Sequence, residues 1–282
     1  MVTPAQQQHL TVGQIRITYL PDGYAVFKPT AVFPTSSSED WQRYQYLLND
    51  DGLLVASIGS HLIQTPDHTI LVDTSHGPRH TQNDIMTLHG GELLASLQSV
   101  GLNPTDIDIV FYTHLHIDHV GWTGRVVDGL QTLTFQRARH LVRNAEWRRF
   151  DDPTVPRRGV DQALKLLEPC IEFAEDGQSI APGVVVHATP GHTVGHSALI
   201  ITSGHERAII MGDTFHSTVQ FEHPEWTNIF DSDTELAKVT RQHVIEELAK
   251  PATYAVGTHF ADTIFGSLTS QQNKPLWQPA EL

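Results

Sequence analysis

The stretch Thr113–Gly121 reads Thr-His-Leu-His-Ile-Asp-His-Val-Gly, which places three histidines and one aspartate within six residues. An apolar run rich in β-branched and aromatic residues, Ile107–Tyr112, precedes it and predicts a strand. Residues two apart in an extended segment point the same way, so His114 and His116 can bind one ion together. The aspartate and the third histidine then face a second ion. The chain must therefore fold so that a strand of a sheet delivers a loop of metal ligands.

Two metal shells need more ligands than this loop supplies, because zinc takes about four donors and a catalytic site keeps one position for water. Three later turns, each after a hydrophobic run, supply His192, Asp213 and His259. If their loops reach the same edge, five imidazoles and two carboxylates meet, and one carboxylate can bridge two ions. The predicted metal ligands are His114, His116, Asp118, His119, His192, Asp213 and His259.

This pattern resembles the metallo-β-lactamase-fold hydrolase superfamily over nearly the whole chain. The superfamily signature His-x-His-x-Asp-His stands here at residues 114–119, and the later ligands follow in the same order. The resemblance implies that His114, His116 and His192 hold one metal, that Asp118, His119 and His259 hold the other, and that Asp213 bridges both. It also implies that Asp73, at the end of the strand-like Thr69–Val72, orients a ligand histidine.

The fold implied by the resemblance is an α/β (α+β) four-layer αββα sandwich, in which two sheets face each other between outer layers of helices. A chain of 282 residues can bury a large core, and we expect a single domain over residues 1–282. Strands are expected at 11–20, 53–64, 69–72, 107–112, 139–142, 180–188, 197–202 and 207–211, and helices at 92–100, 144–150, 160–167 and 234–249.

Two segments are not accounted for by the strands and helices of the expected sandwich. Lys28–Asp51 is a long insertion that contains Trp41, Tyr44 and Tyr46. We expect these aromatic side chains to pack against another surface and not to lie in a solvated loop. Exposed apolar patches mark contact surfaces, so we expect this insertion to form a lip over the active site or a subunit contact, with local packing as the alternative. Asp151–Gly159 is predicted to be a surface loop without a chemical role.

The composition of the chain limits which classes of partner and which cellular compartment we expect. The formal net charge of −14 disfavours a nucleic-acid substrate, whose phosphates would require a basic surface. The single cysteine, Cys170, excludes an intrachain disulfide, and the polar first nine residues lack the apolar core of a signal peptide, so we expect a cytoplasmic protein. No apolar stretch reaches membrane-spanning length. We expect a small-molecule substrate, no nucleic-acid or membrane partner, and a homodimer as one candidate assembly.

The predicted metals indicate hydrolysis. Two divalent ions about 3.5–4 Å apart ionise a bridging water near neutral pH and polarise the oxygen of an electrophile. Asp118 or Asp213 can then take up a proton. Histidine and carboxylate donors suit several metals, and zinc is our expectation for both ions.

Within the superfamily, the segment Gly212–Ser217 and Trp226 resemble the acyl-homoserine lactonases and the methyl parathion hydrolase-like enzymes. Those lactonases carry a tyrosine three residues after the bridging aspartate, whereas this chain has His216, which we predict to be catalytic as a proton donor. The residues predicted to line an apolar substrate pocket are Trp122, Phe215, Trp226 and Phe260.

We therefore expect a dinuclear hydrolase that uses a metal-bridging hydroxide on lactones or related esters. Organophosphate triester hydrolysis and a glyoxalase II-like thioesterase activity are the alternatives within the same chemistry. An iron oxidoreductase of this fold, or a metal-binding protein without turnover, would be a different class, and metal analysis distinguishes these from a two-zinc hydrolase.

Overall fold

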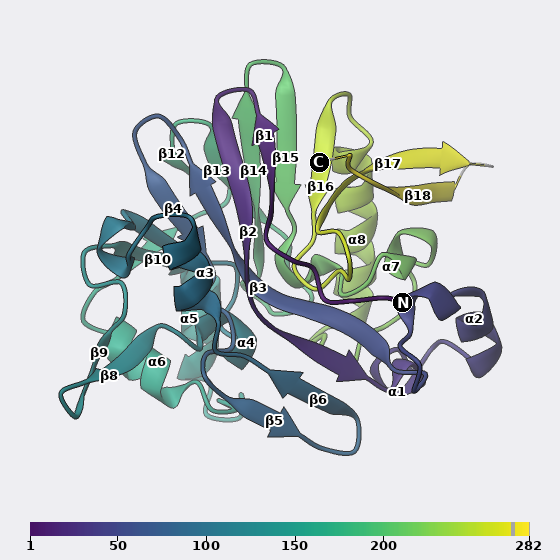
Figure 1. Ribbon diagram of the computed structural model, residues 1–282, viewed down its shortest axis with the longest axis horizontal. Coiled ribbons are helices and arrows are strands. Elements are labelled where there is room, and N and C mark those ends of the chain that lie inside the picture. Colours follow the sequence, from purple (N-terminus) through teal and green to yellow (C-terminus); the bar gives the residue numbers. More distant parts are fainter. Residues whose placement is uncertain (272–273, 282) are drawn as a thin grey trace.

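Two sheets stacked face to face form the centre of the protein (Figure 1), as seen in a computed structural model that describes residues 1–271 and 274–281. The first sheet has the order β11 (Ile171–Ala174), β10 (Arg139–Arg143), β7 (Ile109–Tyr112), β4 (Thr69–Val72), β3 (Leu54–Gln64), β2 (Ile15–Phe27), β6 (Met86–His89) and β5 (His80–Gln82), and β1 (Gln8–Val12) pairs with β2. The second has the order β12 (Ser179–Ala181), β13 (Val184–Ala188), β14 (Ser197–Ser203), β15 (Glu206–Ile210), β16 (Thr253–Val256), β17 (Phe265–Gln271) and β18 (Lys274–Pro279). A separate hairpin pairs β8 (Gly124–Val127) with β9 (Leu130–Leu133).

The helices lie outside the two sheets (Figure 1). They are α1 (Pro29–Val32), α2 (Ser38–Arg43), α3 (Leu93–Ser99), α4 (Ile117–Val120), α5 (Asn144–Arg148), α6 (Asp161–Leu167), α7 (Val219–Glu222) and α8 (Thr234–Leu248), with 3₁₀ turns η1 (Gln45–Leu47), η2 (Pro104–Asp106), η3 (Arg149–Asp151) and η4 (Gly212–Thr214). The helices expected near 92–100, 160–167 and 234–249 are confirmed as α3, α6 and α8. None of the described helices is both long enough and apolar enough to span a membrane.

Strand β7 shows how the layers are built. Ile109 and Phe111 point into the core between the two sheets, whereas Val110 and Tyr112 belong to the core beneath α3 and α6. Successive strand residues face opposite sides, so a strand covered on both faces must be apolar throughout. Burial of each such side chain contributes about 1.5–3 kcal/mol. This arrangement confirms the predicted αββα sandwich, with β7 carrying the ligand loop out of its centre.

Two predicted strands are hairpins instead. The range 11–20 divides into β1 and β2 around Gly13, whose φ of 55° lets the chain reverse. The range 180–188 divides into β12 and β13, and Gly183 at φ 78° has the same role. Apolar residues alternate on both sides of each turn, so the sequence pattern does not reveal the turn. At the turn itself a glycine adopts the left-handed conformation at little cost.

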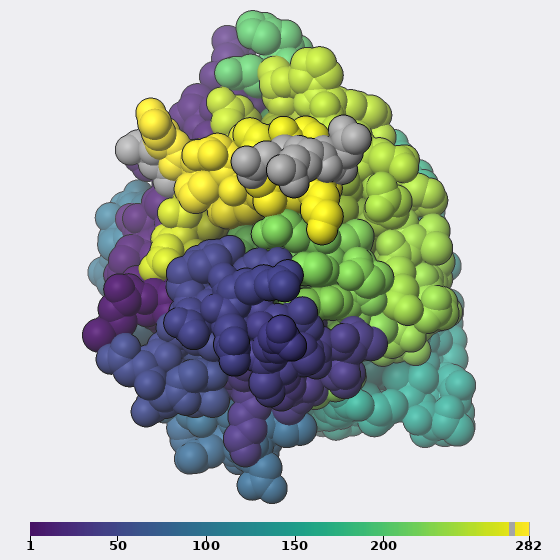
Figure 2. All heavy atoms as spheres, turned by 90° about the vertical axis from the view of Figure 1, so that its right-hand side faces the viewer, coloured from purple at the N-terminus to yellow at the C-terminus, as the bar shows by residue number. Residues whose placement is uncertain are grey.

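The insertion Lys28–Asp51 folds into α1, α2 and η1, and forms the dark-blue surface patch of Figure 2. A capping box between Ser37 and Asp40 begins α2. Trp41 is only 3% exposed, and its ring centroid lies 5.6 Å from that of Trp226. Tyr44 is also buried in this cluster, so these two aromatics pack locally and are not a free surface.

Candidate metal centre

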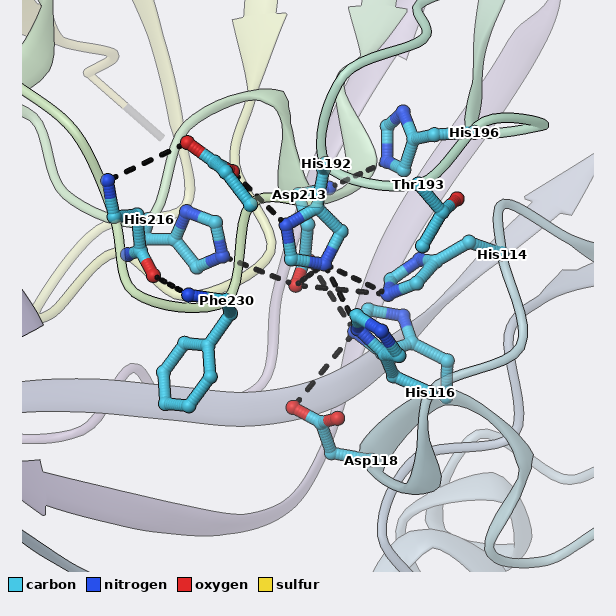
Figure 3. A network of polar contacts seen from close by, with 12 residues as sticks. His114, His116, Asp118, His192, Thr193, His196, Asp213, His216 and Phe230 are labelled. Carbon is cyan, nitrogen blue, oxygen red and sulfur yellow. Dashed lines mark hydrogen bonds and ion pairs between the residues drawn. The ribbon is translucent and has the colours of Figure 1, made fainter. Parts of the chain in front are cut away.

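The predicted ligands converge from the ends of both sheets (Figure 3). The loop after β7 and the short helix α4 carry the four ligands of residues 114–119. From the second sheet, His192 follows β13, Asp213 lies in η4 after β15, and His259 follows β16. The structure thus brings all seven candidates to one place, although they span nearly 150 residues of chain.

The first group consists of His114, His116 and His192, whose ring nitrogens lie within 4.8 Å of one another. His192 Nε2 is 2.9 Å from His116 Nδ1 and 3.2 Å from His114 Nε2. Burial lowers the pKa of both His114 and His116 well below its ordinary value, so these two rings are neutral and present lone pairs. Three imidazoles whose ring nitrogens point at one position match the ligand set of a zinc ion.

The second group consists of Asp118, His119, Asp213 and His259. Asp213 Oδ1 is 3.2 Å from His119 Nε2 and 3.1 Å from His259 Nε2, and Asp118 Oδ2 is 3.8 and 3.7 Å from the same two nitrogens. Burial by itself would lower the pKa of His119, but Asp213, Asp73 and Asp118 outweigh it and raise that pKa well above the usual value. This group therefore carries the negative charge that a second cation would neutralise.

Asp213 lies between the two groups. Its Oδ1 faces His119 and His259, while its Oδ2 is 3.4 Å from His192 Nε2 and 3.8 Å from His114 Nε2. Among the described residues, the buried atoms Asp213 Oδ1 and His119 Nε2 make no hydrogen bond of good geometry, although they lie only 3.2 Å apart. Buried polar atoms without partners are costly. These two atoms without a hydrogen bond, and the donor types around them, fit two divalent cations that share the Asp213 carboxylate.

Asp73 supports the second group in the way the sequence implied. Its Oδ2 accepts a 2.8 Å hydrogen bond from His119 Nδ1, which leaves His119 Nε2 directed at the site. The Thr113 backbone N–H donates to Asp73 Oδ1, and its hydroxyl donates to Oδ2, each at 2.8 Å. Asp73 itself has a φ of 61°, a strained conformation for a non-glycine residue. The carboxylate thus fixes both the tautomer and the orientation of a candidate ligand.

A buried chain of polar groups supports His192 on the opposite side. Its Nδ1 donates to Asp231 Oδ1 at 3.2 Å, and Asp231 Oδ2 pairs with Arg241 Nη1 at 3.2 Å. The side chains of Asp231 and Arg241 are 0% and 1% exposed. Burial by itself would raise the pKa of Asp231, but the hydrogen bond from His192 and the charges of His216 and Arg241 lower it to about 2. The Arg241 guanidinium also donates to two backbone carbonyls. Neither residue stood out in the sequence.

Glu146, at the start of α5, connects the two loops that carry the first group. Its Oε1 accepts from the Leu115 backbone N–H at 2.9 Å, between two of the candidate ligands. Its Oε2 accepts from the Thr193 hydroxyl at 2.6 Å and the Gly195 backbone N–H at 3.3 Å, beside His192. Arg149 Nε lies 2.9 Å from Oε1, so the fully buried carboxylate is paired.

His196 supports the bridging aspartate. Its Nε2 accepts a 2.9 Å hydrogen bond from the Asp213 backbone N–H, and its Nδ1 lies 2.8 Å from the Thr189 hydroxyl. Burial lowers the pKa of His196 to about 3, so the ring stays neutral and can accept. His196 therefore fixes the η4 backbone from which Asp213 projects.

His216 points into the same site (Figure 3). Its Nε2 lies 3.3 Å from Asp213 Oδ2, and the side chain is 9% exposed. Burial lowers the pKa of His216, with Asp213 opposing that shift, and both ring nitrogens lack a hydrogen-bond partner among the described residues. The ring therefore has donor capacity available to a ligand in the cavity.

A cavity of about 500 Å³ opens onto the candidate ligands. His116, Asp118, His192, Asp213, His216 and His259 form its floor. Its apolar wall is formed by Phe27, Val32, Phe33, Leu54, Met86, Leu88 and Phe230. The insertion thus contributes Val32 and Phe33 to the wall, while Trp41 and Tyr44 pack behind them.

The residues predicted to line a substrate pocket lie outside this cavity. None of Trp122, Phe215, Trp226 and Phe260 lines this cavity. Phe215 and Phe260 belong to the core between the sheets, Trp226 packs on Trp41, and Trp122 donates its indole N–H to Asp22 at 2.8 Å. The loop predicted to have no chemical role does line the cavity, through residues 156–159.

The model of the metallo-beta-lactamase superfamily matches residues 58–259, which include every candidate metal ligand. The chain belongs to the metallo-beta-lactamase superfamily. An N-acyl homoserine lactonase of a Bacillus species is 25% identical over 222 residues, which cover 72% of this chain and 81% of the relative. This relationship confirms the prediction of a metal-dependent hydrolase.

Two solved structures of this superfamily fold share nearly the whole architecture. AidC, a dizinc quorum-quenching lactonase in complex with a product, has a TM-score of 0.85 at 23% identity and covers 99% of this chain and 98% of its own. The hydrolase AbOPH has a TM-score of 0.84 at 26% identity, with coverage of 99% and 98%. The likeness to AidC shows the common fold of the superfamily.

Proposed function

We propose that this chain is a dinuclear metallohydrolase that opens lactones and related esters. The observation that carries the proposal is the position of Asp213, whose two oxygens face two separate groups of ligand side chains 3.1–3.8 Å away. In this proposal His114, His116 and His192 hold one ion, Asp118, His119 and His259 hold the other, and Asp213 holds both. Zinc is the metal proposed for both positions.

Two divalent ions in such a site supply a water that ionises near neutral pH and an electrophile for the substrate carbonyl. The residues of the chain orient and move protons around that chemistry. Asp118, whose side chain is 20% exposed at the cavity floor, can accept a proton from the attacking water or from the addition product. Asp73 and Asp231 keep His119 and His192 in the tautomers that direct Nε2 at the site.

His216 is proposed as the residue that hydrogen-bonds the reacting carbonyl or protonates the leaving oxygen. It lies at the boundary between the polar floor and the apolar wall, and its ring centroid is 6.3 Å from that of Phe230. A neutral imidazole can donate one N–H to an oxygen that gains charge in the transition state. His216 lies three residues after Asp213, the position at which the acyl-homoserine lactonases carry a tyrosine.

The cavity wall supports an ester or lactone with an apolar acyl chain. A volume of about 500 Å³ lies within the range for small-molecule sites, and the aromatic and aliphatic residues of the wall surround the space above the floor. The named activity of the Bacillus relative, on N-acyl homoserine lactones, agrees with a substrate of this kind.

The experiment that tests the proposal combines metal analysis with a substrate panel. Purified wild type should hold two metals per chain and hydrolyse N-acyl homoserine lactones or aryl esters faster than phosphotriesters and thioesters. Asp213→Ala should lose metal from both positions and with it the activity, because the carboxylate serves both groups. The matched control is Asp67→Ala, at an exposed aspartate on the turn before β4. Full metal content in Asp213→Ala would refute the bridging role, and a preference for phosphotriesters would refute the substrate class.

A further inference from the structure

The cavity also has a positively charged edge. Arg79, Arg149, Arg157 and Arg158 all line it. Arg149 and Arg157 each lie within 3.5 Å of a carboxylate of their own segment. Within residues 1–271 and 274–281, neither Arg79 nor Arg158 has an ion-pair partner, and they lie on two different loops: Arg79 follows β4 and Arg158 precedes α6. Two cations without partners thus face the same space.

In the part of the chain that the structure describes, no carboxylate compensates the buried charge of Arg79. Burial lowers the pKa of Arg79 without any compensating carboxylate. Burial also lowers the pKa of Arg149, and the nearby Arg158 adds to this shift while Glu146 opposes it. Arg158 therefore adds a second positive charge next to a cation that is already paired. An anion bound at this edge would relieve that repulsion.

His76 adds an unused donor on the Arg79 loop. Its side chain lines the cavity, is only 1% exposed, and both ring nitrogens lack a hydrogen-bond partner among the described residues. Asp22 holds the loop in place by accepting from the backbone N–H groups of His76 and Gly77 at 3.1 and 3.0 Å. A buried imidazole without a partner is costly unless a ligand completes its hydrogen bonds.

We propose that the cavity binds substrates that carry a carboxylate, which Arg79, Arg158 and the His76 imidazole hold while the ester or lactone lies over the metal ligands. The proposal rests on the proposed function for the reacting group and adds the class of substrate. Guanidinium groups bind carboxylates through paired, charge-assisted hydrogen bonds. The whole-chain charge of −14 does not prevent this, because charges farther away than about 8 Å are largely screened at physiological salt.

Binding of two matched, non-ester probes to the zinc-loaded protein tests the proposal by titration calorimetry. The probes are the anilide of hexanoic acid and the mono-anilide of adipic acid, which differ by a terminal methyl against a terminal carboxylate. We expect the acid to bind at least about 10-fold more tightly than the neutral probe. The double variant Arg79→Gln/Arg158→Gln should reduce this ratio by about 10-fold or more, and Arg16→Gln, an exposed arginine on β2, should leave it unchanged.

Equal binding of both probes to wild type would overturn the proposal. A preference for the acid that persists in the double variant would also overturn it, because the carboxylate would then be bound elsewhere, for example by the metals. Turnover of phenyl hexanoate by the same zinc-loaded protein tests hydrolysis separately. Acid selectivity without turnover would refute only the hydrolase proposal, and turnover without acid selectivity would refute only this one.

Discussion

Replacing Asp231 by asparagine is the sharpest test of how the first ligand group is held. Asp231 accepts from His192 Nδ1 and from Arg241 Nη1, each at 3.2 Å, and its side chain is fully buried. An amide of the same shape offers one acceptor and one donor, so in either orientation its NH₂ group faces another donor. The substitution also leaves the Arg241 charge buried without its carboxylate.

The magnitude follows from those contacts. Removing one partner of a buried ion pair costs about 3–5 kcal/mol, and because asparagine keeps one acceptor we expect about 3 kcal/mol. At about 2 °C per kcal/mol for a chain of this length, the Tm of the metal-free protein should fall by about 6 °C. Loss of the carboxylate that orients a ligand histidine should also weaken metal binding by about 10–100-fold.

Calorimetric unfolding of the metal-free protein and competition for zinc with a chelator measure these two effects. Asp67→Asn is the matched control, since that aspartate is exposed and should change neither value. A Tm within about 1 °C of wild type, together with unchanged zinc affinity, would contradict this reasoning. It would show that Asp231 does not position His192 and that the Asp231–Arg241 ion pair does not stabilise the fold.

Three further outcomes are expected. His216→Ala should lower kcat by about 10–1000-fold while both metals stay bound, as seen in steady-state kinetics and metal analysis; an unchanged kcat would leave His216 a packing role only. Phe230→Ala should raise KM for long acyl chains by roughly 10-fold more than for short ones, because its ring forms the cavity wall, and a uniform change in KM would contradict this. Burial lowers the pKa of His61 to about 4 and of His196 to about 3, so the unfolded chain takes up protons first as pH falls below 6.5. The metal-free protein should therefore lose stability between pH 6.5 and 4 in urea unfolding, and a flat profile would exclude these histidines as the cause.

The convergence of the seven candidate ligands could be predicted from the sequence because their positions follow local rules. The spacing within residues 114–119 and the strand before it are visible in the chain, and Asp73 stands at the end of a strand as expected. Each later ligand follows a hydrophobic run that the structure confirms as a strand, at β13, β15 and β16. Strand ends gather at the edges of sheets, so local pattern was enough to place the candidate site.

The residues that support the ligands could not be predicted in this way. Asp231, Glu146 and Arg241 are charged residues in polar segments, and such residues are usually exposed. Only the tertiary packing buries them and gives each one a partner. Arg158 was likewise assigned to an inert loop, because nothing in its neighbours shows that the loop folds back over the cavity.

The candidate ligands come from both sheets, and this has a mechanical consequence. His114 follows a strand of the first sheet, whereas His192 and His259 follow strands of the second. Ions shared between them would act as cross-links that join the two halves of the sandwich at one rim. A ligand present at about 1,000 times its dissociation constant stabilises a fold by about 4 kcal/mol. Two polypeptides produced by a cut in the exposed segment at Pro153 and Thr154 would then reassemble more tightly as zinc is added, and a chelator would separate them again. The metal concentration would then determine the affinity between the two fragments as well as the activity of the site.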